Sequence, residues 1–169
     1  MTRQYNSYGR DLISIENLHF APSITGQDLL NRGIQLLSQR NYPQAVSVLS
    51  DAIKIDPLLS DTPYYLAIAL LSGKKPRKVD EWTIRDIEEQ LRVAVDKDAN
   101  PSRCYVLWAI VKHGFYTMNG FIENPPTSAE LFSLGESIQA KDVEEILYHL
   151  NDPSNPCWLR LYNKFGKAH

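Results

Sequence analysis

Apolar residues recur at helical spacing in two neighbouring stretches near the start of the chain. Residues 26–38 carry one such apolar face, and residues 42–55 carry a second after a three-residue turn. Pro43 lies just inside the second stretch, where its missing N–H is tolerated, and Asp56-Pro57 ends it because proline disfavours helix at the preceding residue. The pattern predicts a hairpin of two antiparallel amphipathic helices over residues 26–57.

Small residues of this hairpin recur farther along the chain. Gly33 is followed 34 residues later by Ala67 and, after 42 more, by Ala109, each inside an apolar segment. In the second helices, Ala52 is followed 42 residues later by Ala94. The offsets agree if eight extra residues lie in the turn of the second unit, around positions 72–81. We therefore expect repeated hairpins, whose predicted bounds are residues 26–57, 60–99 and 102–138.

The first unit resembles a tetratricopeptide repeat, a 34-residue helix–turn–helix unit. The residues that carry the resemblance are Gly33, Tyr42, Ala45, Leu49, Ala52 and Pro57. Leu29 departs from the family, which often has tryptophan there, and an ordinary hairpin of another all-helical domain is the alternative. Because one hairpin cannot bury its faces alone, the resemblance implies an all-α fold, a short right-handed superhelix of about three hairpins.

Further segments flank the three units. Residues 1–25 form a polar, irregular arm whose apolar side chains could dock on the first unit or remain loosely held. Residues 140–150 predict an amphipathic helix with Asp142, Glu144 and Glu145 on its solvent side. Residues 156–165 predict a last helix that caps the open end of the solenoid.

The resemblance also implies a binding surface, because the first helices of such repeats line a concavity that commonly binds peptides. The positions expected on it are Gln27, Leu30, Asn31, Ile34, Leu37, Tyr64, Tyr65, Ile68, Arg103, Val106, Ile110 and His113. Some family members clamp a carboxylate from these positions, but Leu30, Ile34 and Val106 offer it no ionic partner. An apolar groove suits an amphipathic helix instead, either of a partner or of this chain's own last helix, with Trp158 and Tyr162.

Charge offers one alternative site. The net charge of −2 and a sequence pI near 6.1 give no global attraction for nucleic acid or an anionic membrane. A basic loop holds the only notable charge cluster, which comprises Lys74, Lys75, Arg77 and Lys78. It is either a site for nucleic acid or another anionic ligand, or a solvated loop between two helices.

Catalytic patterns are missing from the sequence. The four histidines, His19, His113, His149 and His169, show no metal-ligand spacing, and the two cysteines form no zinc motif. No phosphate-binding loop or nucleophile motif occurs, so no cofactor or metal is expected. Without a leader or a membrane span, we expect a cytoplasmic, non-enzymatic adaptor. Its expected partner is a protein, bound as a peptide or amphipathic helix, and self-association as a homodimer is a further possibility.

Overall fold

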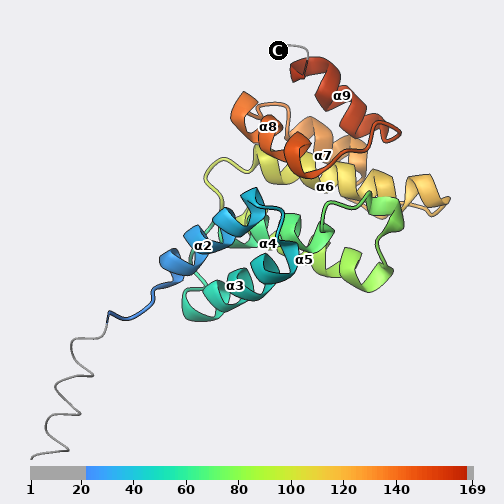
Figure 1. Cartoon of the computed structure of the whole chain (residues 1–169). Coiled ribbons are helices and arrows are strands. Elements are labelled where there is room, and N and C mark those ends of the chain that lie inside the picture. Colours follow the sequence, from blue (N-terminus) through green and yellow to red (C-terminus); the bar gives the residue numbers. More distant parts are fainter. Residues whose placement is uncertain (1–21, 167–169) are drawn as a thin grey trace, which may run out of the picture.

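The computed structural model describes residues 22–166, and Figure 1 shows their arrangement. Most of the predicted arm, together with His19 and His169, lies outside the described residues. Within residues 22–166 there are eight α-helices and no strand, as predicted. The α-helices are α2 (Gly26–Ser38), α3 (Tyr42–Ile55), α4 (Thr62–Leu71), α5 (Glu81–Lys97), α6 (Ser102–Phe115), α7 (Ser128–Leu134), α8 (Ala140–His149) and α9 (Pro156–Phe165); two 3-10 turns are η1 (Pro76–Lys78) and η2 (Thr117–Asn119).

Polar side chains fix the beginnings of several helices. Thr25 caps α2 in a capping box with Asp28, and Thr127 caps α7 in the same way with Glu130. The carboxylate of Asp80 accepts a hydrogen bond from the Thr83 N–H at the start of α5. These local signals explain why the helix boundaries could be predicted closely from the sequence.

Consecutive helices form three stacked hairpins. Helix α2 packs on α3, α4 on α5 and α6 on α7, while α3 with α4 and α5 with α6 join the units into a helical-repeat superhelix (Figure 1). The turn of the second hairpin runs from 72 to 80 and contains η1, which confirms the predicted extra residues. The all-α fold predicted from the repeat spacing is therefore confirmed.

The recurring small residues lie where helices cross closely. A Cβ atom added to Gly33 would overlap the side chain of Leu49 on the facing helix. Ala52, Ala67 and Ala109 are fully buried, and so are Ala45 and Ala94. Close helix approach therefore explains the spacing that revealed the repeats.

Replacing Gly33 by leucine should lower the free energy of unfolding by about 2 kcal/mol, since the added side chain overpacks a core without room for it. Urea denaturation followed by circular dichroism measures the change. Asn31→Leu, on an exposed position of the same helix, should change stability by less than about 0.5 kcal/mol. Adding Leu49→Ala to Gly33→Leu should recover part of the loss, and strict additivity of the two would contradict the steric explanation.

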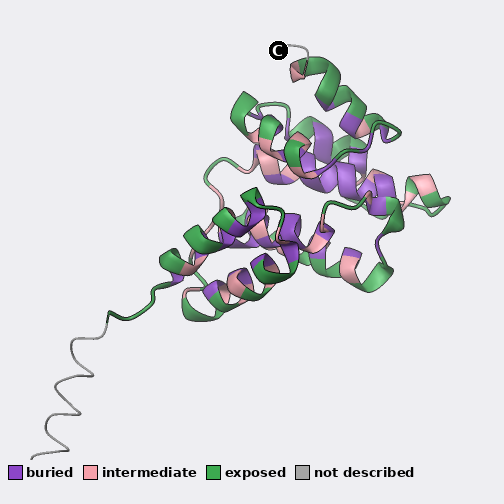
Figure 2. Cartoon of the chain, viewed as in Figure 1, coloured by how far each residue is buried: buried purple, intermediate pink, exposed green. Residues whose placement is uncertain are grey.

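Helices α4 and α6 form the centre of the molecule. Figure 2 shows buried residues along both, and in α4 they occur on nearly every side. Helices α3 and α5 pack against this centre, and the C-terminal helices α8 and α9 also contact α6. The first helix of the third hairpin is thus covered in part by helices that lie outside the repeats.

Candidate functional site

Helix α8 lies across the first helices of the repeats. The Tyr65 hydroxyl of α4 donates to Glu145 Oε2 at 3.4 Å, and the Tyr148 hydroxyl donates to the Ser38 carbonyl at 2.7 Å. Between α8 and the repeats remains a hollow of about 380 Å³, lined by Ile34, Leu37, Ser38, Tyr65, Lys141, Glu144, Glu145, Tyr148 and His149. We call the side chains of α2, α4 and α6 that face α8 the concave surface.

Half of the twelve residues that were predicted to line the groove belong to the core. The buried ones are Leu30, Leu37, Tyr64, Ile68, Val106 and Ile110. They belong to the hydrophobic core that the helices share, so a partner cannot reach them in this conformation. Ile34, Tyr65 and Arg103 are only partly buried. Gln27 and Asn31 are exposed and hydrogen-bond to each other at 3.0 Å.

Helix α8 contacts the part of the concave surface formed by α2 and α4, whereas α9, the alternative occupant of the groove, packs on α6. Helix α9 packs on α6 and α8 at the C-terminal end of the stack. Trp158 is buried there, stacks on Tyr162 with ring centroids 5.2 Å apart, and donates its indole N–H to the Leu150 carbonyl. Helix α9 therefore serves as the predicted cap.

His113 also lies away from the surface to which sequence analysis assigned it. Its Nδ1 atom is 3.4 Å from Ser128 Oγ and 3.8 Å from Glu123 Oε1. The Glu123 carboxylate accepts hydrogen bonds from the Ser128 N–H and hydroxyl. His113 thus belongs to a polar cluster that joins α6 to the start of α7.

Arg103 is the charged centre of the concave surface. Its guanidinium lies 2.5 Å from Asp61 Oδ1 and 3.3 Å from Asp98 Oδ2, and it stacks over the Tyr64 ring at 4.4 Å. Only 14% of the side chain is exposed, so these contacts are partly shielded from water. The repeat spacing predicts Arg103 on this surface, but it does not reveal the two carboxylates that hold the guanidinium.

Glu145 faces the repeats, although sequence analysis placed it toward solvent. Burial raises the pKa of its carboxyl, and hydrogen bonding to tyrosine and the nearby Arg103 charge oppose this only in part. The buried Tyr64 hydroxyl also lies beside this carboxylate and stabilises its charged form. Burial likewise raises the pKa of Tyr65 to about 12, so its hydroxyl stays a donor at neutral pH.

The end of α8 is attached to the first hairpin. His149 Nδ1 lies 3.2 Å from the Tyr42 hydroxyl, and Arg40 donates to the Tyr148 carbonyl at 3.2 Å. The Arg40 guanidinium also lies 4.6 Å from the centre of the Tyr148 ring. These contacts join residues more than 100 positions apart, which is why helical periodicity could not reveal them.

Acidification should loosen this attachment. Burial, with the nearby Arg40 charge, lowers the pKa of His149 to about 4. Because the folded-state pKa lies below the unfolded value near 6.5, the stabilisation from neutral His149 is complete above that value and is lost as pH falls toward 4. The two pKa values correspond to about 2 kcal/mol between pH 7 and 5, and solvent screening of the partly exposed ring reduces this, so the free energy of unfolding should fall by about 1 kcal/mol more in wild type than in His149→Asn. Equal pH dependence in urea titrations of both proteins would contradict this assignment.

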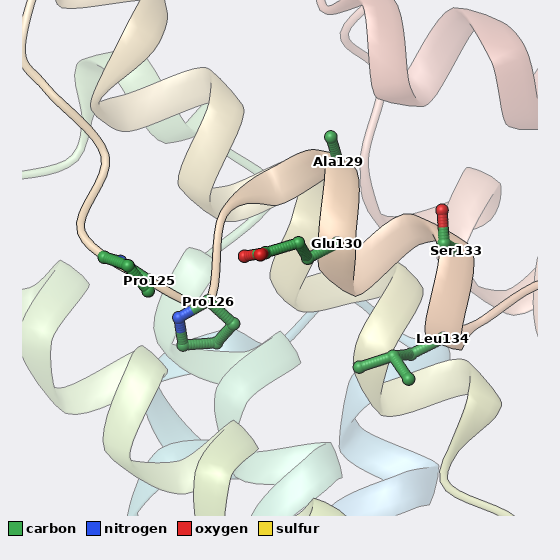
Figure 3. Close-up of a pocket in the computed structure, with 6 residues that line it drawn as sticks. All are labelled: Pro125, Pro126, Ala129, Glu130, Ser133 and Leu134. Atoms are coloured by element: carbon green, nitrogen blue, oxygen red, sulfur yellow. The ribbon is translucent and has the colours of Figure 1, made fainter.

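A second, wider hollow lies beside α7 and is shown in Figure 3. Its volume is about 900 Å³, and its lining is Pro125, Pro126, Ala129, Glu130, Ser133 and Leu134. The buried Lys112 ammonium holds the loop between η2 and α7 by donating to the carbonyls of Asn124 and Pro126. The hollow is mostly apolar, and sequence analysis gave no indication of it.

The basic loop is partly engaged in the fold. Lys75 Nζ lies 3.7 Å from the buried Asp152 carboxylate, and Pro76 is buried. Lys74, Arg77 and Lys78 are exposed. Anion binding by the loop stays a prediction, and one of its four cations already has an acidic neighbour.

The cysteines and the acidic residues offer little reactive chemistry. Burial raises the pKa of Cys104 to about 12 and that of Cys157 to about 11, which disfavours the nucleophilic thiolate. Across residues 22–166 no group of three or more His, Cys, Asp or Glu side chains is arranged to hold a metal ion. None of the helices in the described part of the chain is both long and apolar enough to cross a membrane.

Comparison with known proteins leaves the family open. No family model matches this chain, and a search of curated proteins finds no similar sequence. The resemblance to tetratricopeptide repeats therefore depends on the residue spacing, while the structure defines the class of protein as an all-α helical-repeat protein.

Proposed function

We propose that this protein is a non-enzymatic, cytoplasmic adaptor of the tetratricopeptide-repeat type, whose concave surface binds an amphipathic helix of a partner protein. The observation that carries the proposal is α8, an amphipathic helix already held on this surface by the Tyr65 side chain of α4 and the Ser38 carbonyl of α2. Helix-in-groove binding uses the same combination of an apolar stripe and a few polar contacts.

Helix α8 is suited to be displaced. Its buried residues are Val143 and Ile146, and segments 135–139 and 150–155 connect it to its neighbours. The hairpins α2–α3 and α4–α5 pack on each other through α3 and α4, so their stacking does not depend on α8. A partner helix could therefore replace α8 while the repeats remain folded.

A fluorescent peptide of residues 138–150 tests the proposal. The host is the full chain with Ile146→Ser, which removes a buried anchor of its own α8. The peptide should bind this host at least about tenfold more tightly than wild type, in which α8 competes. Adding Ile34→Asp on the concave surface of this host should weaken peptide binding about tenfold or more relative to the Ile146→Ser host alone, because the bound peptide would bury the new charge. The matched control is Gln35→Asp on an exposed position of α2.

Absence of peptide binding, or equal binding with Ile34→Asp and Gln35→Asp, would refute the concave surface as the binding site. Salt dependence separates the proposal from the anion-binding alternative. Binding at the concave surface should change little between about 50 and 300 mM salt. Binding of an anionic ligand by the basic loop should instead weaken steeply over the same range.

A further inference from the structure

The loop after α6 carries two large apolar side chains into solvent. Phe121 is 57% exposed and Ile122 is 88% exposed, although both follow a helix that is mostly buried. A Cβ atom added to Gly120 would meet no atom within 4 Å, so the chain projects outward at this point. We call residues 119–122 the apolar tip.

Backbone hydrogen bonds hold the apolar tip in place. The Phe121 N–H donates to the Tyr116 carbonyl at 2.8 Å, and Gly120 adopts the left-handed conformation, with a φ of 79°, that commonly ends a helix. The centre of the Phe121 ring also lies 6.0 Å from that of Phe115 on α6. The exposure of Ile122 is therefore fixed by the ending of α6.

The apolar tip itself carries no charge. Glu123 is the only charged residue between α6 and α7, and its side chain is only 10% exposed. Its carboxylate accepts hydrogen bonds from the Thr117 hydroxyl and from the N–H and hydroxyl of Ser128. These contacts engage the carboxylate within the fold, so it does not keep an apolar or anionic surface away from the tip.

Basic side chains lie beside the apolar tip. The Asn119 amide donates to the Arg77 carbonyl at 3.2 Å, which joins the tip to η1 of the basic loop. Both η1 and η2 pack on α6, so the two loops share one end of this helix. Lys74, Arg77 and Lys78 are exposed there.

Positive charge is in excess at this end of the molecule. Residues 74–81 hold four cations and two carboxylates, although the whole chain carries a net charge of −2. Both carboxylates have other partners: Asp80 accepts from the Thr83 N–H at the start of α5, and Glu81 lies 2.5 Å from Arg85. The exposed cations of the basic loop are thus available to an anionic partner.

We propose that the apolar tip and the exposed cations of the basic loop dock the protein on an anionic lipid surface, with Phe121 and Ile122 entering the headgroup layer. A bilayer accepts both kinds of side chain without a preformed pocket, since apolar groups enter its interface while cations meet anionic headgroups. Nucleic acid would have to open its base stack to take up Ile122. This docking is independent of helix binding at the concave surface.

Co-sedimentation of the full chain with vesicles tests the proposal. Phosphatidylcholine vesicles with about 30% phosphatidylserine should bind the protein at least about tenfold more tightly than vesicles of phosphatidylcholine alone. Ile122→Ser should weaken binding to the anionic vesicles about fivefold or more, because it removes apolar area that enters the interface. Arg77→Glu should weaken it about tenfold or more, because it reverses a charge near the surface.

Two matched controls keep the same chemical changes away from the apolar tip. Leu58→Ser replaces another apolar residue, 84% exposed in the turn after α3. Arg32→Glu makes the same change in net charge on an exposed position of α2, which Figure 1 shows on the opposite side of the molecule from the residues after α6. Both variants should bind the anionic vesicles like wild type.

Insertion of the tip has a direct readout. An environment-sensitive dye attached through Ile122→Cys should shift its emission to shorter wavelength when anionic vesicles are added, whereas the same dye attached through Leu58→Cys should not. Burial raises the pKa of Cys104 and Cys157, so the exposed introduced thiol reacts first. The absence of a shift at position 122 would overturn the proposal even if the vesicles bind the protein.

The remaining outcomes also decide the proposal. Equal binding to the two kinds of vesicle, or binding to neither, refutes docking on an anionic lipid surface. If Ile122→Ser binds as wild type does, the apolar tip takes no part and the proposal is wrong. If a short DNA duplex or inorganic phosphate releases the protein from vesicles more effectively than chloride of equal ionic strength, the basic loop is a general anion site instead.

Discussion

Replacing Arg103 by alanine is expected to lower the free energy of unfolding by about 3–5 kcal/mol. The substitution leaves the carboxylates of Asp61 and Asp98 without their common cation. Asp98, of which only 14% is exposed, suffers most, because a partly buried charge without a partner is poorly solvated. The Tyr64 ring also loses the guanidinium stacked over it. Urea denaturation at pH 7 measures the loss.

Two further variants distinguish a buried charged centre from an ordinary surface ion pair. Arg103→Lys keeps the positive charge but not the planar fork that reaches two carboxylates, so it should recover only part of the stability. Arg92→Ala removes an exposed arginine next to Glu89 and Asp96, and should cost less than about 1 kcal/mol. Equal losses for Arg103→Ala and Arg92→Ala would contradict the role assigned to Arg103.

The repeat architecture was predictable because its determinants are local or periodic. Gly33, Ala67 and Ala109 mark close helix crossings, and the structure confirms each as a buried small residue. The sequence Asn155-Pro156 likewise marks the beginning of α9, where the asparagine side chain caps the helix and proline occupies its first turn. Such signals depend on neighbours in sequence, so a single chain is enough to read them.

The site was less predictable, because its contacts join distant parts of the chain. The apolar positions Val143 and Ile146 predicted an amphipathic α8, but periodicity does not say which surface a helix covers. Glu145 lies at the edge of that apolar stripe and therefore resembled a solvent-facing residue. Leu30 and Val106 were predicted to line a groove because the repeat pattern takes no account of helices that follow the repeats.

The same distinction explains why periodicity predicted α9 as a helix but left open which surface it covers. Its strongly amphipathic face predicted burial, and Trp158 is indeed buried. The surface that receives it depends on the connection at residues 150–155, which brings α9 against α6. That connection is held by Asn155, a polar residue in the interior that hydrophobic patterning does not mark.

Replacing Asn155 by alanine should lower the free energy of unfolding by about 2–4 kcal/mol. Its side-chain oxygen caps α9 by accepting from the N–H groups of Cys157 and Trp158, and its amide nitrogen donates to the Ile110 carbonyl at 2.9 Å. Asn155 is fully buried, so alanine leaves these groups with neither a protein partner nor water. Gly114 permits the approach, because a Cβ there would lie 2.9 Å from the Asn155 amide nitrogen.

Serine at the same position separates the two roles of Asn155. Asn155→Ser keeps an oxygen that can cap α9 but cannot reach the Ile110 carbonyl, so it should lose about half as much stability as alanine. Asn163→Ala, on an exposed position of α9, should change the free energy of unfolding by less than about 0.5 kcal/mol. Hydrogen exchange adds a local readout, since amides of α9 should exchange faster in Asn155→Ala while those of α3 are affected less. If Asn155→Ala proves as mild as Asn163→Ala, this residue does not attach the C-terminal cap to α6.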